Sequence, residues 1–331
     1  MSLNRAIALL LIVLSLVAVI FGVRRQQESF ELSRTFTMRS DTPSLELVVL
    51  EGPIFPDYQT LQGPLTVRDR LLALAQEDQD NIKGVLLTIN SGGGTVGLSA
   101  ELYDAVRRLR EKKPVVVTVM DVAASGGYYV ASAADKIYTN PGSILGSIGV
   151  IGGFLNFTGL MERVGIADQT YKAGSYKDTG SPFRKETPEE RQMVEAELRD
   201  MHQQFIRDVA KGRGLDVEAV RKLADGRTYT GRQCLDNKLV DAIGTAEDAL
   251  QELRKLARAK FNLPETEKLP LNRAARPLDR VLRDLFWQGL GEERLRTDPL
   301  ALMRLGQPWN PRGVPLAFWI GELPRYQWPA S

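Results

Sequence analysis

The sequence predicts an α/β fold in which alternating strands and helices build a parallel sheet buried on both faces. Two uncharged, β-branched runs, GVLLTIN at Gly84–Asn90 and VVVTVM at Val115–Met120, are typical of buried strands. Each run is followed by a glycine-containing turn and then by a helical pattern, the order expected of βαβ units. The chain has 331 residues, of which 43% are hydrophobic and 25% charged, so it can bury a substantial core.

The remaining elements follow in order along the chain. Strands are predicted at residues 45–50, 84–90, 115–120 and 136–139, and helices at about 66–76, at 98–110 and directly after Ser125. A long helix is predicted over Thr187–Arg213, with Thr187 as N-cap and Pro188 in the first turn. Ligands bind beyond the carboxyl ends of parallel strands, so the glycine loop after residue 90 and the Ser125 turn both fall on the functional edge.

Five regions are predicted. Residues 1–5 form a short tail, 6–23 a transmembrane anchor, 24–42 a stalk, 43–261 the main folded domain, and 262–331 an extension of unknown role that contains proline and tryptophan.

The anchor prediction depends on residues 6–23, which carry no charge and are just long enough to span a bilayer core as a helix. A cleaved signal peptide is the alternative, but no small-x-small cleavage site stands at the end of the run. Arg24 and Arg25 follow it, so a literal count of flanking charges would place the main domain in the cytoplasm.

Composition excludes several classes of function. A net charge of +2 without a dense basic block gives no electrostatic footprint for nucleic-acid binding. One cysteine, Cys234, allows neither an intrachain disulfide nor a cysteine-based zinc site. His202, the single histidine, excludes a multi-histidine metal site, and any Ser-His-Asp triad would have to use it. It neighbours the apolar stripe of an otherwise polar helix, which favours a structural or solvated role.

The stretch DVAASGGYYVA, Asp121–Ala131, is the centre of the functional argument. A strand that breaks into Ser-Gly-Gly at a helix start exposes the Ser125 hydroxyl at the sheet edge. It also directs free backbone N–H groups, that of Gly126 first, at whatever the hydroxyl attacks. Ser125 is therefore either a plain N-cap or a nucleophile, and this stretch alone leaves both interpretations open.

The glycine loop also has two interpretations. Gly92, Gly94 and Gly97 match the dinucleotide-binding pattern G-x-G-x-x-G, but Asp121 lies too far along the chain to be its ribose-binding acid. Alternatively, the N–H of Gly93 pairs with that of Gly126 to form an oxyanion hole.

A serine nucleophile needs a base, and a lysine can serve where its neutral form is favoured. The segment YKAGSYKDTGSPFR, Tyr171–Arg184, offers Lys172 and Lys177, and spacing alone does not select between them.

An ordered series of motifs from about residue 47 to 249 resembles the signal peptide peptidase A family, membrane-anchored serine proteases of the ClpP/crotonase-like fold. The series is LEGPI, NSGGG, DVAASGGYY, AADKIYTNPGSILGSIGVIG, YKAGSYKDTGSPFR and DGRTYTGRQCLDNKLVDAIG. The resemblance identifies residues 43–261 as a peptidase domain.

Carried over position by position, the family nucleophile is Ser125 and its lysine base is Lys177. The serine that supports the lysine amine is Ser147, and the oxyanion glycine is Gly93. The family's usual proline before the Gly-Gly pair is replaced by Gly92, which makes the oxyanion assignment weaker than the dyad.

The resemblance further implies a ring-shaped homo-oligomer whose dyad is completed across subunits, with no cofactor or metal. Its substrates would be cleaved signal peptides or other apolar membrane-derived peptides. The catalytic domain would lie on the extracytoplasmic side of the cell membrane, against the charge count. A crotonase-type acyl-CoA enzyme and a catalytically silent membrane scaffold of the same fold are the alternatives.

Overall fold

The computed structural model describes residues 42–56, 63–76 and 80–273. The chain divides into two units, Met1–Pro43 and Ser44–Ser331, and almost all described residues belong to the second. The predicted anchor at residues 6–23 lies outside the described residues, as does most of the predicted extension. None of the helices within the described ranges has the length and apolarity needed to cross a bilayer.

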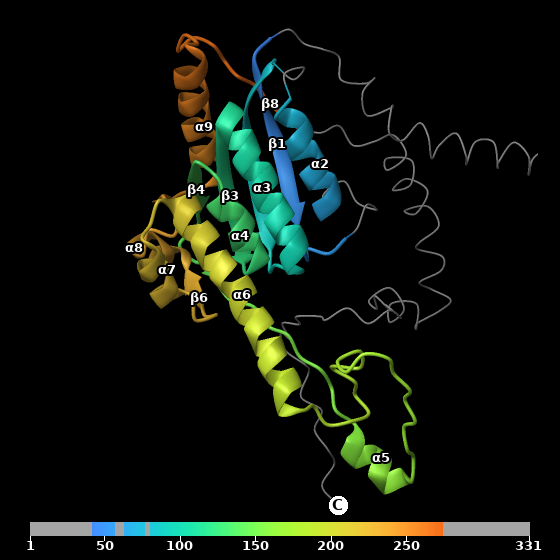
Figure 1. The fold of residues 1–331 in the computed structure, drawn as a ribbon. Helices are drawn as coiled ribbons and strands as arrows, with labels where there is room; N and C mark the ends of the chain where they lie inside the picture. The colour runs from blue at the N-terminus through green and yellow to red at the C-terminus, as the bar shows by residue number, and fades with distance from the viewer. Residues whose placement is uncertain (1–41, 57–62, 77–79, 274–331) are drawn as a thin grey trace, which may run out of the picture. The chain divides into compact units, whose positions relative to one another are not determined.

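The second unit is built on one mostly parallel sheet (Figure 1). Its strands are β1 (Ser44–Glu51), β2 (Ile82–Ser91), β3 (Val115–Ala124), β4 (Lys136–Thr139), β5 (Ile144–Gly146), β6 (Thr228–Thr230), β7 (Ala242–Ile243) and β8 (Leu271–Arg273). Along the main path the order is β6-β5-β3-β2-β1-β8, while β4 pairs with β3 and β7. The β5–β6 pair is antiparallel and the other pairs are parallel. The predicted α/β fold with a mostly parallel sheet is confirmed.

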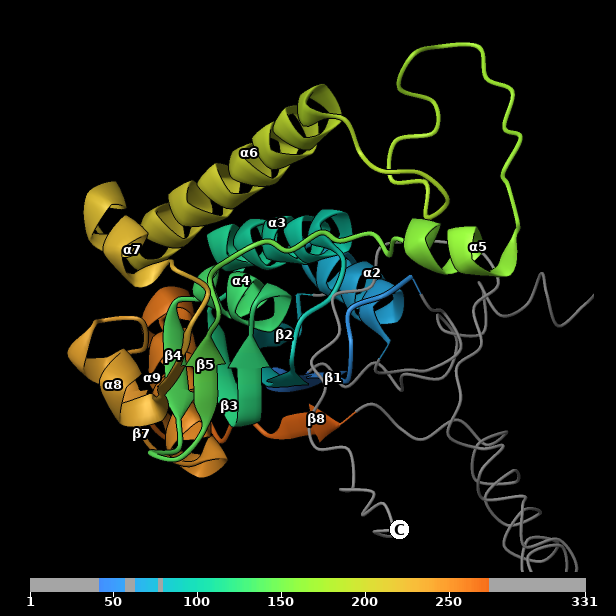
Figure 2. The ribbon, with the colours of Figure 1, turned by 90° about the horizontal axis from the view of Figure 1, so that it is seen from below.

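Helices cover both faces of this sheet, which is why its central strands are apolar on both sides. On one face, α2 (Pro64–Leu74), α3 (Val96–Lys112) and α4 (Gly126–Ser132) pack over alternate strand residues such as Val115 and Val117 (Figure 2). On the other face, α9 (Ala246–Phe261) packs over residues such as Leu86 and Val116. The smaller helices α7 (Val217–Leu223) and α8 (Gly231–Asp236) follow the long helix α6 (Pro188–Arg213).

The long helix α6 (Pro188–Arg213) has the predicted N-cap. The Thr187 hydroxyl accepts from the Glu190 N–H, and the Glu190 carboxylate accepts from the Thr187 N–H, which makes a capping box. In its C-terminal half, Phe205, Ile206, Val209 and Ala210 are buried and α6 packs against α4. Its N-terminal half buries no apolar side chain.

Residues 151–187, here called the arm, join the sheet to the start of α6 and contain the short helix α5 (Thr158–Val164). Both ribbon views place α5 and the connection from α5 to α6 beyond the N-terminal end of α6, away from the sheet (Figures 1 and 2). At the end of the sheet formed by β1, the late strand β8 pairs with β1. The sheet therefore includes residues beyond 261, the predicted end of the main domain.

Candidate active site

Ser125 stands where β3 ends and α4 begins, in an uncommon backbone conformation. Its φ is 50° and its ψ is −122°, values that cost a non-glycine residue about 1–3 kcal/mol and that cluster at functional sites. It occupies the N-cap position of α4, yet its side chain accepts no capping hydrogen bond. The plain N-cap interpretation therefore lacks the interaction that would define it.

Two backbone hydrogen bonds hold Ser125 in this conformation. Its N–H donates to the Gly146 carbonyl at the end of β5 (2.8 Å), and its carbonyl accepts from the Tyr129 N–H in α4 (2.9 Å). The neighbouring strand and the new helix thus fix the serine from both sides, and its side chain is half-buried.

Gly93 lies directly against this turn. A Cβ on Gly93 would lie 2.6 Å from the Gly126 nitrogen and 2.9 Å from the Ser125 Cβ, and the φ of Gly93 is +95°. No other residue fits here without moving the backbone. The Gly126 N–H belongs to the first turn of α4, where N–H groups have no intrahelical acceptor. The predicted nucleophile and oxyanion glycines are therefore neighbours.

The glycine loop that contains Gly93 is held by the side chain of Ser91 and by the segment that follows β1. The Gly93 N–H donates to the buried Ser91 hydroxyl (3.2 Å), so binding an oxyanion would require this N–H to change partner. The Gly93 carbonyl accepts from the Ile54 N–H (2.9 Å), and the Ile54 carbonyl accepts from the Thr95 N–H (2.9 Å). The segment after β1 thus fixes the orientation of the loop. By contrast, a Cβ on Gly92 would meet nothing within 4 Å, so crowding does not exclude the family's proline there.

Ser147 and Lys177 lie in different settings. Ser147 directly follows Gly146, the residue that accepts from Ser125; its φ is 50°, and its N–H donates to the Arg227 carbonyl (2.9 Å). Lys177 is exposed on the arm, and its N–H donates to the Gly174 carbonyl (3.2 Å). Within one chain, the structure brings together the predicted glycines, Ser125 and the end of β5 that directly precedes Ser147. Lys177 lies on the arm, outside this group.

Comparison with known proteins identifies the family to which this chain belongs. The family model described as "Peptidase family S49" matches residues 107–260, and a model described as "Clp protease" matches residues 62–143. A protein of Synechocystis sp. named "Putative protease slr0021" is 43% identical over 187 residues, which cover 56% of this chain and 68% of the relative. The chain belongs to peptidase family S49. The resemblance to the signal peptide peptidase A family is confirmed, as is the ClpP-like fold.

Two other relatives of this S49 chain are matched over a smaller share of their own length. The protein of Enterococcus faecium named "Putative signal peptide peptidase SppA" is 44% identical over 181 residues, covering 54% of this chain and 52% of the relative. "Serine protease SPPA, chloroplastic" of Arabidopsis thaliana is 33% identical over 247 residues, covering 72% of this chain and 36% of the relative. The chain thus spans about half the length of the Enterococcus relative and about a third of the Arabidopsis one.

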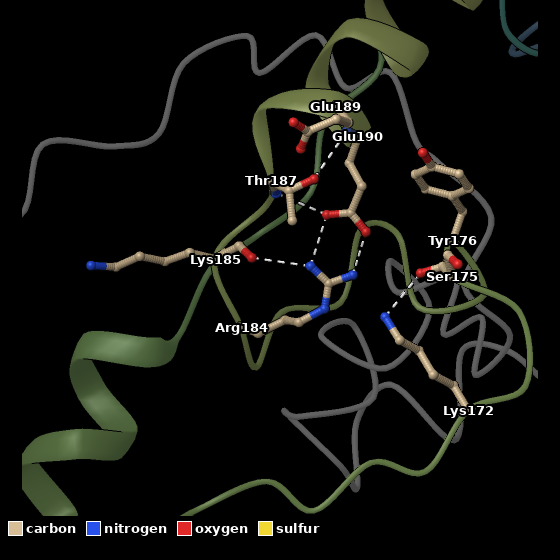
Figure 3. Close-up of a pocket in the computed structure, with 8 residues that line it drawn as sticks. All are labelled: Lys172, Ser175, Tyr176, Arg184, Lys185, Thr187, Glu189 and Glu190. Atoms are coloured by element: carbon tan, nitrogen blue, oxygen red, sulfur yellow. Dashed lines mark hydrogen bonds and ion pairs between the residues drawn. The ribbon is translucent and has the colours of Figure 1, made fainter.

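The arm of this S49 chain contains an ion cluster that the sequence analysis did not anticipate. Arg184 pairs with Glu190 (Figure 3). It also pairs with Asp178, to which Lys172 donates as well (2.6 Å). Hydrogen bonds from Arg184 and Lys172 hold the pKa of the Asp178 carboxyl below its usual range. Arg184 and the Thr187 N–H lower the pKa of Glu190 to about 2.

A cavity of about 340 Å³ opens beside this cluster and includes neither the Ser125 turn nor the glycine loop. It is lined by Lys172, Ser175, Tyr176, Arg184, Lys185, Thr187, Glu189 and Glu190 (Figure 3). Lys172, the second candidate base, is occupied there by Asp178 and by the Ser175 carbonyl (2.9 Å).

A second cluster joins α4 to α6. The Tyr129 hydroxyl bonds to the Asp208 carboxylate, and the Tyr103 hydroxyl donates to the Asp208 carbonyl (2.9 Å). The Tyr129 ring stacks on Phe205 with 4.4 Å between centroids. Burial first, and then the Asp208 charge, raises the pKa of Tyr103 to about 12, so this phenol stays protonated as a donor.

The single histidine, His202, and the single cysteine, Cys234, both lie in surroundings that indicate a structural role. The His202 Nε2 lies 3.3 Å from the Ile148 carbonyl oxygen. Cys234 is buried, and burial raises the pKa of its thiol to about 12, so it is not a nucleophile at neutral pH.

Proposed function

We propose that this chain is a serine endopeptidase in which Ser125 is the nucleophile and Lys177 the general base. The observation that carries the proposal is the strained Ser125, uncommitted as a cap and packed against Gly93 and Gly126 at the carboxyl ends of the strands. Membership of a peptidase family supports the reaction class, because this arrangement is what acyl transfer requires.

The reaction proceeds by proton transfer and acyl transfer. Neutral Lys177 takes the proton of the Ser125 hydroxyl while the oxygen attacks a peptide carbonyl. The tetrahedral oxyanion is held by the Gly93 and Gly126 N–H groups, the first of which exchanges Ser91 for the oxyanion. The C–N bond then breaks, and the Lys177 ammonium gives its proton to the leaving amine. Water hydrolyses the acyl-enzyme by the same steps and releases Ser125.

The base is proposed to come from a neighbouring subunit of a homo-oligomeric ring, where Ser147 holds its amine in the neutral, acceptor form. The arm supports this arrangement because it carries an unusual number of exposed apolar side chains for a monomer. These are Ile151, Phe154, Leu155, Phe157, Leu160, Val164, Ile166, Tyr171, Tyr176 and Phe183.

The proposed substrates are cleaved signal peptides or other apolar peptides from the membrane, in keeping with the name of the Enterococcus relative. The uncharged run at residues 6–23 supports an anchor, with the catalytic domain on the extracytoplasmic side of the cell membrane. Large domains translocate largely regardless of flanking charge, so the two arginines after the run do not oppose this orientation.

A catalytically silent scaffold is the second candidate. The observation that favours it is that the connection from α5 to α6, which carries Lys177, lies beyond the N-terminal end of α6 and away from the sheet (Figures 1 and 2). A scaffold would assemble but would not hydrolyse peptides.

The decisive experiment measures hydrolysis of an apolar fluorogenic peptide by the detergent-solubilised full chain from pH 6 to 10. We expect turnover that rises with pH in the wild type and none in Ser125→Ala or Lys177→Ala. Mixing those two inactive variants during assembly should restore turnover, because a site then receives its serine and its lysine from different subunits. Activity in either single variant would refute the dyad; inactivity of an assembled wild type would favour the scaffold.

A further inference from the structure

The arm lacks the apolar core that normally holds a protein segment in one conformation. Within the described stretch from Ile151 to Gln204, Glu190 is the one residue that is buried, with 3% of its surface exposed. Ordering such a segment costs conformational entropy that apolar burial does not offset here. Polar interactions must therefore hold the loop that carries Lys177.

Arg184 supplies those interactions through every N–H of its guanidinium. Its Nε donates to Asp178 Oδ2 (2.7 Å), and its Nη2 donates to Asp178 Oδ1 (2.8 Å) and to Glu190 Oε1. Its Nη1 donates to Glu190 Oε2 (2.8 Å) and to the Lys185 carbonyl (3.0 Å). A guanidinium has five donors, and all five are used. The group is therefore committed to the arm and has no donor left for a substrate carboxylate.

The two carboxylates held by Arg184 lie at opposite ends of the segment. Asp178 is the residue directly after Lys177, whereas Glu190 is in the first turn of α6 and closes the capping box with Thr187. Glu190 also accepts from the Thr179 hydroxyl (3.1 Å). The backbone at Lys177 is thus tied through one buried carboxylate to the helix that packs on α4.

The far side of the same segment is held by the chain before α5. The Phe157 N–H donates to the Pro182 carbonyl (2.7 Å), and the Asn156 amide donates to the Arg184 carbonyl (3.1 Å). A Cβ on Gly180 would lie 2.5 Å from the Phe154 ring, so the chain before α5 and the chain after it are in close contact within the arm.

We propose that Arg184 is a positioning residue for the reaction, and that the clamp of Arg184, Asp178 and Glu190 sets where Lys177 is presented. This inference rests on the proposed role of Lys177. The clamp is charge-balanced: Lys172 and Arg184 face Asp178 from the arm, and Glu190 faces Arg184 from α6. Removing Arg184 frees the backbone beside Lys177 and leaves an excess of negative charge next to it.

The test compares Arg184→Gln with Arg191→Gln in the full chain. Arg191 is a matched control, because it lies in the first turn of α6, close in sequence to the clamp, and 67% of its side chain is exposed. Among the described residues it pairs with exposed Glu186 and Glu195 and not with the clamp. A misplacement of about 1 Å can cost about 100-fold in rate, so we expect kcat to fall by about that factor in Arg184→Gln. The control should retain wild-type kcat, and light scattering should show both variants assembled.

Two further readouts separate positioning from general damage. The excess negative charge favours the lysine ammonium, so the rise of activity with pH should move to higher pH in Arg184→Gln and stay in place in the control. The KM should stay close to the wild-type value in Arg184→Gln, because all five Arg184 donors are already used within the clamp and none is left to bind substrate. Wild-type kcat in Arg184→Gln, beside an inactive Lys177→Ala, would overturn the clamp and leave the dyad standing. An active Lys177→Ala would overturn the dyad itself.

If Arg184→Gln does not assemble, Arg184→Lys takes its place. A lysine keeps the positive charge between the two carboxylates but cannot reproduce the five-donor fork. We expect it to assemble, with a reduced kcat. Wild-type kcat in Arg184→Lys would show that charge alone suffices and would refute positioning by the fork.

Discussion

The Ser125 turn and the arm hold their proposed catalytic groups by different physical means. At the turn, apolar strands and helices pack on both sides, and glycines admit contacts that no side chain would allow. In the arm, apolar side chains face outward and an ion cluster takes the place of a core. A site built by close packing is rigid within one chain, whereas a segment held by charges depends on pH, on salt and on whatever covers its apolar side chains.

The largest effect should come from filling the space at the turn. Gly93→Ala would place a methyl group 2.6 Å from the Gly126 nitrogen in a conformation that only glycine adopts readily. We expect peptide hydrolysis to fall by about 100- to 1000-fold, the loss typical of a damaged oxyanion hole. The matched control is Gly92→Ala, where the added Cβ meets nothing within 4 Å. Equal losses in both variants would show that close packing is not what defines this edge.

As pH falls, the arm should lose its ordered structure before the sheet does. The folded-state pKa of Glu190 is about 2, below the ordinary value of 4.5, because Arg184 and the Thr187 N–H favour its ionised form. A depressed carboxyl pKa stabilises the fold above the unfolded pKa, and this stability is lost as pH falls through the folded pKa. Asp178 shifts in the same direction. Hydrogen exchange between pH 5 and 2 should show residues 172–187 losing protection while β2 and β3 keep theirs; simultaneous loss would contradict separate means of support.

A smaller effect is expected where the two regions are joined. Tyr129→Phe removes the hydroxyl that bonds to Asp208 and leaves the ring stacked on Phe205. Losing the hydrogen bond to charged Asp208, together with the longer one that the hydroxyl accepts from Gln204 (3.4 Å), should lower the free energy of unfolding by about 1.5–3 kcal/mol. Chemical denaturation measures this change. Tyr171→Phe, at a side chain 93% exposed, should have no effect. Equal stability of the two variants would mean that this bond does not secure α6 to α4.

The smallest expected effect is a gain. Gly92→Pro restores the family's proline at a position with open space, and the preceding residue lies in a strand, as proline prefers. Reducing the freedom of the unfolded chain should stabilise the protein by about 0.4–1 kcal/mol with activity retained. Thermal unfolding would detect the change. A loss of stability would show that the loop needs a backbone conformation at Gly92 that proline does not allow.

The fold was predictable because its main strands are long and apolar on both faces. The predicted strands and the helices around them lie where the periodicity placed them, and the Thr187 cap was visible in the letters Thr-Pro-Glu-Glu. The short strands β5, β6 and β8 were not predicted, because strands of three residues carry no period and form through pairing with distant partners.

The site was predictable as a set of residue types, but its geometry was not. Ser-Gly-Gly after a buried strand pointed to Ser125, and the glycine loop pointed to Gly93. The bond between the Gly93 N–H and Ser91 depends on local dihedral angles that a sequence does not display. The Arg184 cluster joins side chains six residues apart in a loop, where no repeat relates them. The membrane anchor, the subunit ring and the location stay predictions.

The length of α6 has a mechanical consequence. The helix has 26 residues, and its buried apolar side chains all lie in its C-terminal half, from Phe205 onward. At 1.5 Å per residue the part of the helix before Phe205 is about 26 Å long, so a tilt of about 3° at Phe205 would move the N-terminal end by about 1.3 Å. Such a displacement exceeds what catalytic geometry tolerates. Because α6 acts as a lever, small changes in the packing of Tyr129 on Phe205 are amplified at the other end of the helix. The stiffness of this ring contact therefore limits how accurately the N-terminal end of α6 is positioned.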